Sequence, residues 1–460
     1  MQPSRYSWKL LIDALVFKKK LIAAIGGAVA ATFVLVSFVV WTLPTSEPGP
    51  PGSMDAQDLP KLNDDSLSIE LVAEGLEFPT SMAFLDVGNI LVLQKNDGEV
   101  RLVSNDQLLV PPVIQIKVAN EVERGLLGIA IAKSGDDTNQ SAGTDVFLYF
   151  TEIVGESEGG SEKLRNRVYK YQYDWEKRIL SDPVRILDLP GDPGPFHNGG
   201  KITIGPFDGR LYAVIGDTNA GGGMLDNEIG GRQPDDKSVI FRVDRDTGMP
   251  LEDNPLTGNR SGYADSKLGR YYAYGIRNGF GMDFDPVSHA LWMTENGPET
   301  YDEINIVKPG LNSGWHKVTG PIGRTNVTIG SDLVMFEGAR YEDPVFSWYT
   351  TIGVTELEFL DSNMLGDKYA NNIFVGDINN GNLYFFEVNE NRTGLRFQDS
   401  RLNDLVADPV PDDSPSEIST ILFGTGFGRI TDLETGPDGM LYVLTYEDGK
   451  IYRISKKPSA

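Results

Sequence analysis

Side chains suited to acid–base chemistry stand together in one glycine-rich segment of this 460-residue chain, residues 194–217 (GPFHNGGKITIGPFDGRLYAVIGD). His197 lies in a loop just before a predicted strand, and Asp217 follows the next strand of the same repeat. An imidazole oriented by a carboxylate is the usual arrangement of a general base near neutral pH. The pair is therefore a candidate catalytic base, although this local sequence also suits a purely structural histidine.

A second segment, residues 274–286 (YGIRNGFGMDFDP), holds an arginine between glycines. A guanidinium fixed in this way is suited to face a carboxylate or a developing oxyanion. An arginine that only ties loops together would show the same pattern, so the sequence leaves both interpretations of Arg277 open.

A third segment, residues 294–305 (TENGPETYDEIN), is acidic. Its four carboxylates fall within nine residues: Glu295, Glu299, Asp302 and Glu303. Such a cluster suits Ca²⁺, a hard cation that takes about 6–8 oxygen ligands and accepts backbone carbonyls among them. Asp302 and Glu303 are therefore candidate calcium ligands, and a solvated acidic loop is the alternative.

Composition excludes several classes of protein. The chain has no cysteine, which rules out disulfides, thiolate metal sites and a cysteine nucleophile. With only 3 histidines it cannot build a histidine-rich metal cage. Its formal net charge of −25 argues against nucleic acid as a partner, because phosphate contacts need clustered Lys and Arg.

One strand–turn–strand theme recurs along the chain and predicts the fold. The copies are NILVLQKNDGEVRLV, DVFLYFTE, GRLYAVIGD, ALWMTENGPETYDEINIV, NIFVGDINNGNLYFFEV and GMLYVLTYEDGKIYRI. Apolar and polar residues alternate in them with the period of a strand, and the turns between are rich in Gly and Asn. Six copies predict an all-β, six-bladed β-propeller over residues 66–456, with 67–71 as the strand that joins the last repeat and closes the ring.

The N-terminal region has a different composition. Residues 21–43 carry no charge and are long enough to cross a membrane, and residues 1–20 hold five basic side chains against one acidic. We predict a cytoplasmic basic segment (1–20), a transmembrane helix (21–43) and a Pro/Gly-rich linker (44–65), with the propeller on the extracytoplasmic side. A cleaved signal peptide is the alternative.

Taken together, these segments resemble the glucose/sorbosone dehydrogenase family. Its members are six-bladed propellers that oxidise sugars with pyrroloquinoline quinone (PQQ) and Ca²⁺. The three segments above carry the resemblance, with LNSGW after them, ERGLLGIAI at 123–131 and GFGRITDLETGPDG at 426–439. It covers about residues 68–455.

The resemblance implies roles for individual residues. His197 matches the catalytic base and Asp217 its supporting carboxylate. The remaining positions bind the cofactor or its calcium ion. Beside the quinone's reactive carbonyl lie Arg277 and Asn278; the Ca²⁺ is held by the backbone oxygens of Gly297 and Pro298; further cofactor contacts are Arg429, Trp348 and Thr350.

Three positions depart from the family pattern. Glu123 stands where the soluble glucose enzymes have glutamine, Asn379 where they have a cofactor-binding lysine, and Thr431 where they have a second arginine. Because PQQ carries three carboxylates, the loss of two cations should weaken its binding. Lys201 is a candidate to compensate. The implied activity is therefore that of a broad aldose dehydrogenase rather than of a glucose enzyme.

The expected reaction is PQQ- and Ca²⁺-dependent oxidation of aldoses at the anomeric carbon to lactones. His197 would take the hydroxyl proton while hydride moves to the quinone. The sequence specifies neither the sugar nor the electron acceptor. The alternatives are a Ca²⁺-dependent, lactonase-type propeller hydrolase and a non-catalytic extracellular propeller that binds a protein or glycan.

Overall fold

The computed structural model describes residues 59–133, 143–156, 160–257, 267–410 and 416–458. The predicted cytoplasmic segment and transmembrane helix lie outside these ranges, as do residues 44–58 of the predicted linker. Among the described residues no helix has the length and apolar character needed to cross a bilayer. Their helical segments are short turns such as α2 (Ile329–Asp332).

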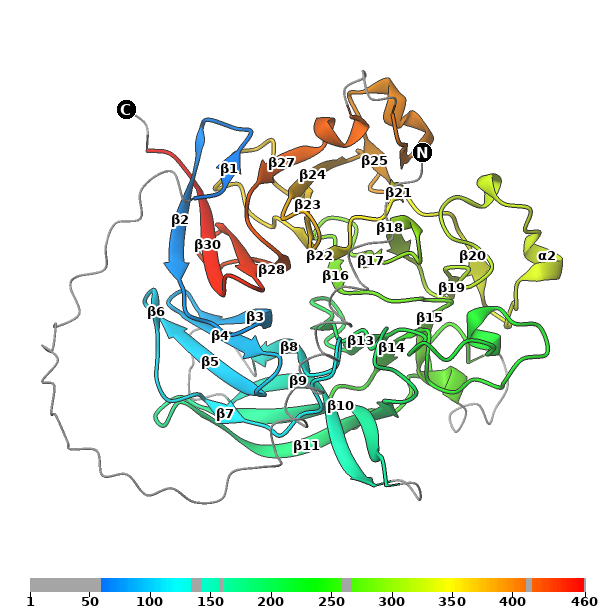
Figure 1. Ribbon diagram of the computed structural model, residues 1–460, viewed down its shortest axis with the longest axis horizontal. Helices are drawn as coiled ribbons and strands as arrows, with labels where there is room; N and C mark the ends of the chain where they lie inside the picture. The colour runs from blue at the N-terminus through cyan, green and yellow to red at the C-terminus, as the bar shows by residue number, and fades with distance from the viewer. Residues whose placement is uncertain (1–58, 134–142, 157–159, 258–266, 411–415, 459–460) are drawn as a thin grey trace, which may run out of the picture. The chain divides into compact units, whose positions relative to one another are not determined.

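The strands of the described residues form six sheets. Each begins with one inner strand: β3 (Pro79–Asp86), β8 (Leu126–Lys133), β12 (Ile202–Ile204), β16 (Gly281–Phe284), β22 (Val354–Phe359) and β28 (Ile430–Thr435). Neighbouring inner strands contact each other in chain order, and β28 contacts β3 again. The inner strands therefore surround a common axis, and the all-β propeller prediction is confirmed (Figure 1).

The outer strands complete the sheets. The first sheet adds β4 (Asn89–Gln94), β5 (Glu99–Ser104), β6 (Gln107–Leu108) and β7 (Ile114–Gln115). The second adds β9 (Thr144–Glu156), β10 (Glu162–Asp174) and β11 (Ile179–Pro190). The third adds β13 (Leu211–Ile215), β14 (Val239–Val243), β15 (Tyr271–Tyr274), β19 (Leu311–Asn312) and β20 (Arg340–Tyr341). The fourth sheet adds β17 (Leu291–Glu295), β18 (Thr300–Val307), β21 (Phe346–Thr350) and β26 (Val406–Ala407). The fifth adds β23 (Ile373–Asp377), β24 (Leu383–Val388), β25 (Leu395–Arg396), β27 (Leu422–Thr425) and β1 (Lys61–Leu62). The sixth adds β29 (Leu441–Thr445), β30 (Lys450–Lys456) and β2 (Leu67–Ala73).

The sixth sheet joins a strand from the beginning of the propeller to the last strands of the chain. Strand β2 pairs with β30 in antiparallel register, with Ile69 opposite Ile454, and in Figure 1 the blue strand lies beside the red one. The predicted ring-closing strand is confirmed. One detail differs from the prediction. Strand β1 lies within the predicted linker but pairs with β27, because backbone hydrogen bonds to a sheet edge do not require buried side chains.

The hydrophobic core is divided among the junctions between sheets. Six clusters of buried side chains each join two neighbouring sheets, from Leu91 against Leu148 between the first and second to Leu444 against Val92 between the last and first. Alternating strand residues supply them, since one face of each sheet packs on the preceding sheet and the other on the next.

A buried ion pair joins the fourth and fifth sheets. Asp285 is completely buried and accepts a 2.8 Å hydrogen bond from Arg392 Nε, on the turn that follows β24. The arginine side chain is 12% exposed. At the outer edge of the fifth sheet, by contrast, Arg396 is 67% exposed and pairs with Glu387.

Arg392→Ala should lower the free energy of unfolding by about 3–5 kcal/mol, because it leaves the Asp285 carboxylate buried without its cation. The exposed pair provides the control: Arg396→Ala should cost less than about 1 kcal/mol. Guanidinium denaturation of both variants measures the difference, and equal losses would contradict the account of this junction.

Candidate active site

A central cavity of about 290 Å³ lies at one end of the inner strands. Its lining comes from all six sheets or the loops beside them, so it exists only because the ring is closed. Polar groups in the lining include Lys95, Glu123, Lys201, Thr355, Arg429 and Thr431.

The first predicted segment places its histidine and carboxylate in contact. His197 Nδ1 and Asp217 Oδ1 are 2.6 Å apart, and both side chains are buried. A carboxylate at Nδ1 favours the tautomer with its proton there, which leaves Nε2 free to accept another proton. Burial opposes ionisation of Asp217, but the attraction and hydrogen bond of His197 and the hydrogen bonds of Asn219 and Trp315 together outweigh it, so the pKa of this carboxyl lies below its usual value.

Asp217 has two further donors. The backbone N–H of Asn219 lies 2.6 Å from Oδ1, and the indole N–H of Trp315 lies 2.9 Å from Oδ2. Both carboxylate oxygens are thus fixed, which fixes the plane of the imidazole in turn. Trp315 belongs to the LNSGW motif, and the sequence analysis gave it no role.

Backbone hydrogen bonds connect the three predicted segments. The N–H of Asp217 donates to the carbonyl of Arg277 at 3.0 Å, and the N–H of Asn296 donates to the carbonyl of Asn278 at 2.8 Å. A Cβ on Gly216 would lie 2.2 Å from the Arg277 carbonyl oxygen, so only glycine permits this approach. Motifs up to a hundred residues apart therefore share one site.

Glu123 also bonds to the histidine loop and to the second segment. Its Oε2 accepts the backbone N–H of His197 at 2.6 Å and Nδ2 of Asn278 at 3.1 Å. Asn278 Oδ1 in turn accepts the N–H of Gly199 at 3.2 Å. Burial raises the pKa of Glu123, although these donors and His197 oppose the shift.

Arg277 is held over an aromatic ring. Its Nη1 donates to the carbonyl of Asn296 at 2.9 Å, and its guanidinium carbon lies 5.4 Å from the centroid of the Trp315 ring. Its Nε is buried without a hydrogen-bond partner, and burial lowers the pKa of the guanidinium. This site can therefore offer a desolvated cation with a spare donor.

The third segment divides into separate environments. Asp302 accepts the backbone N–H of Gly297 at 2.9 Å and those of Ile352, Gly353 and Val354 across the neighbouring strand, which leaves it little capacity for an ion. It thereby shapes the turn that contains Gly297 and Pro298. Among the described residues, no hydrogen bond reaches either of these two carbonyl oxygens.

Glu303 lies directly opposite Glu295 in the β17–β18 ladder, and both are buried. Glu303 accepts the N–H of Gly320 at 2.6 Å, and Glu295 accepts the Ser313 hydroxyl at 2.6 Å. Burial raises the pKa of both carboxyls, and their mutual repulsion adds to the shift of Glu303. Within the described ranges, no three histidine or acidic side chains are grouped to hold a metal, and Glu299 is exposed.

The remaining predicted residues are split between the cavity and other places. Arg429 lines the cavity and is 51% exposed, with Glu447 3.1 Å away. Asn379 is exposed, next to the lining residue Ile378, and Thr350 is exposed at the end of β21.

Trp348 requires a correction. It is completely buried and packs on Phe346, Tyr384 and Phe386 in the core between the fourth and fifth sheets, so its ring does not line the cavity. The reason is its place in β21: the first three residues of this strand are buried in that core, and only the last two, Tyr349 and Thr350, are exposed.

Lys201, the candidate compensating cation, already has partners. Its ammonium pairs with Glu356, with Asp432 at 3.2 Å and with Glu434 at 3.8 Å, all near the axis. Sequence reasoning missed Lys95, which also lines the cavity. Its ammonium donates to the carbonyls of Asn120, Val122 and Arg124, and burial lowers its pKa to about 8. A lysine directly after the first strand of the first repeat, now β4, was the only signal for it.

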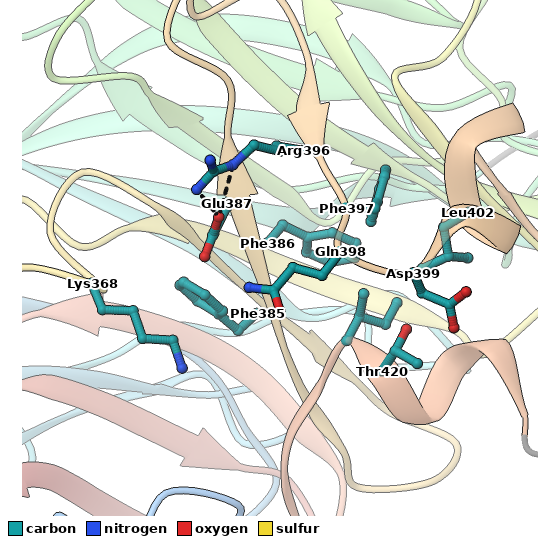
Figure 2. Close-up of a pocket in the computed structure, with 11 residues that line it drawn as sticks. Lys368, Phe385, Phe386, Glu387, Arg396, Phe397, Gln398, Asp399, Leu402 and Thr420 are labelled. Carbon is teal, nitrogen blue, oxygen red and sulfur yellow. Dashed lines mark hydrogen bonds and ion pairs between the residues drawn. The ribbon is translucent and has the colours of Figure 1, made fainter.

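A larger cavity, of about 490 Å³, lies beside β24 and β25 (Figure 2). Lys368 and the rings of Phe385 and Phe397 line it, and Arg396 and Glu387 pair with each other at its edge. No imidazole is in its lining. His197 is not in the lining of the central cavity either, but it lies two residues before Gly199, and Glu123, which accepts its backbone N–H, lines that cavity as well.

Comparisons with known proteins agree with this site. Residues 76–453 match the family model Glucose / Sorbosone dehydrogenase. The chain is 26% identical to aldose sugar dehydrogenase YliI of Escherichia coli (strain K12) over 400 residues, which cover 85% of this chain and 94% of the relative.

Solved structures share the fold. The apo form of the soluble aldose sugar dehydrogenase from Escherichia coli has a TM-score of 0.63 at 25% identity and covers 85% of this chain and 100% of its own. The PQQ-bound aldose sugar dehydrogenase from Streptomyces coelicolor has a TM-score of 0.59 at 23% identity and covers 87% and 100%. Because the family model spans nearly the whole propeller, the chain belongs to the glucose/sorbosone dehydrogenase family.

Proposed function

We propose that this chain is a PQQ- and Ca²⁺-dependent aldose dehydrogenase that oxidises the anomeric carbon of sugars to lactones, and that its six sheets are six blades. The observation that carries the proposal is the His197–Asp217 pair, 2.6 Å apart and adjacent in the chain to residues that line the central cavity. The family match and the similarity to an aldose sugar dehydrogenase support it.

The cavity offers cations to an anionic ligand, beside the carboxyl groups of Glu123, Glu356 and Asp432 in its lining. Three cationic side chains line it, those of Lys95, Lys201 and Arg429, and Arg429 has the most accessible charge. The buried hydroxyl of Thr355 lines the same cavity without a hydrogen-bond partner, and Arg277 Nε is unpartnered as well. Buried polar groups are rarely left unsatisfied, so these two favour a polar ligand.

Calcium would be held by the free carbonyl oxygens of Gly297 and Pro298, which suit a hard cation. Asp302 and Glu303 are the proposed ligands of a further Ca²⁺ ion. Each would exchange hydrogen bonds for the ion, because Asp302 accepts backbone N–H groups and Glu303 accepts the N–H of Gly320 and Nδ2 of Asn305. Asn379, next to the lining residue Ile378, and Thr350, exposed at the end of β21, are proposed as outer contacts of the cofactor.

PQQ with its Ca²⁺ supplies the hydride acceptor that the side chains lack. In the proposed reaction His197 accepts the proton of the sugar's anomeric hydroxyl at Nε2, while Asp217 stabilises the imidazolium that results. Arg277, fixed over Trp315, presents its cation where negative charge develops. The hydrogen bonds of Glu123 to His197 and Asn278 fix the position of the histidine loop relative to Arg277.

The hydrolase alternative fits less well. A lactonase-type site needs carboxylates around a metal near the propeller axis. In this chain Glu356, Asp432 and Glu434 surround the ammonium of Lys201 instead. A purely binding propeller would not need a doubly braced histidine–aspartate pair.

We also propose that residues 21–43 anchor the chain in a membrane, with the propeller on the extracytoplasmic side. The support is the uncharged run and the basic residues before it.

Purified protein incubated with PQQ and Ca²⁺ should reduce a redox dye when aldoses are added. Omission of PQQ, or chelation of the calcium, should abolish the signal. If no sugar of a broad aldose panel leads to dye reduction, the proposal is refuted.

His197→Ala should lower kcat by about 10²–10⁴-fold, since the base is lost, and should leave PQQ binding intact. The control is His289→Ala, at an exposed turn where the ring stacks on Phe207. Steady-state kinetics and a PQQ titration distinguish the two steps. Unchanged kcat in the His197 variant would remove the residue from its assigned role.

Arg429→Gln should raise the Kd for PQQ by about 10- to 100-fold, because it removes a charged hydrogen bond to a carboxylate. At saturating PQQ, kcat should stay near that of the wild type. Arg396→Gln, far from the central cavity, serves as the control, and an equal effect of both changes would contradict the assignment.

A further inference from the structure

We propose that Glu123 takes up one proton when PQQ binds, so that the cofactor affinity of this chain falls as pH rises. The inference rests on the proposed function. It concerns a residue at which this chain has a carboxyl group and the soluble glucose enzymes have a neutral amide.

Glu123 lies in the cavity wall without a cationic partner. It lines the cavity, and its carboxylate accepts hydrogen bonds from neutral donors, the backbone N–H groups of His197 and Asn198 and Nδ2 of Asn278. Among the described residues no lysine or arginine forms an ion pair with it. An ionised carboxylate in this wall would therefore face the carboxylates of the incoming cofactor with no ion pair of its own.

The cations nearby are committed to other groups. Lys95, on the loop after β4, donates to three carbonyls of the segment that carries Glu123, and the ammonium of Lys201 is shared among three carboxylates. Arg429 lies beside Glu447. The charged or titratable groups that face Glu123 from the surrounding elements are Lys95, His197, Lys201, Arg277, Glu356, Arg429, Asp432 and Tyr446.

The surroundings of Glu123 already favour the protonated form of its carboxyl group. Burial raises the pKa of Glu123 above its ordinary value of 4.5 in the protein without cofactor. An anion placed beside it raises this pKa further. Linkage then requires that binding of the anion takes up a proton wherever the free protein has Glu123 ionised and the complex has it protonated. Affinity is therefore highest at low pH and declines as pH rises through the pKa of the free protein.

The test is calorimetric titration of the cofactor-free protein with PQQ at saturating Ca²⁺, from pH 5 to pH 7.5. This window lies above the ordinary glutamate pKa and below that of Lys95 at about 8. Two buffers of different ionisation enthalpy at each pH give the number of protons taken up. The measurement needs no turnover, so it is independent of the sugar and the dye.

Two variants isolate the carboxyl group. Glu123→Gln keeps an oxygen that can accept hydrogen bonds from His197 and Asn278, but it removes the group that titrates. Glu121→Gln, two residues earlier with a side chain 72% exposed, removes an equal charge outside the cavity.

We expect wild type and the Glu121 variant to take up about one more proton than the Glu123 variant at the upper end of the window. The ratio of the wild-type Kd to the Glu123→Gln Kd should grow by up to about tenfold per pH unit. The same proton uptake and pH slope in all three proteins would overturn the inference and leave the proposed function standing. Absence of PQQ binding at every pH would overturn both.

Discussion

The pairing of β2 with β30 is the constraint on which the rest of the molecule depends. It joins a strand from the beginning of the propeller to the last strand of the chain and closes six sheets into a ring. Only a closed ring brings Thr80, in β3, and Tyr446, between β29 and β30, into the wall of one cavity. The six hydrophobic clusters at the sheet junctions support the same closure, because each sheet must bury both of its faces.

Within that frame, the site is built by carboxylates that orient other groups. Asp217 fixes the imidazole of His197, Glu123 fixes its backbone, and Asp302 shapes the turn of Gly297 and Pro298. Each carboxylate uses short bonds to donors on a different loop. The result is a preorganised histidine beside a desolvated arginine, which is the arrangement that proton removal with charge stabilisation requires.

Much of this could be predicted from the sequence. The period-2 strands predicted the all-β propeller and its closing strand. The positions of His197, before one predicted strand, and Asp217, after the next, indicated the pair. What could not be predicted depends on packing between distant segments. The burial of Trp348 follows from which face of β21 meets the fifth sheet. Trp315, as a donor to Asp217, and Lys95, as a cap on the Glu123 loop, depend on loop paths that one sequence does not reveal.

The central claim is that PQQ and Ca²⁺ occupy the central cavity beside His197. A crystal structure of the protein grown with both tests it most directly. The account predicts PQQ between Glu123 and Arg429, with Ca²⁺ on the carbonyl oxygens of Gly297 and Pro298. PQQ bound outside this cavity, or a metal ion held there by acidic side chains without it, would contradict the account.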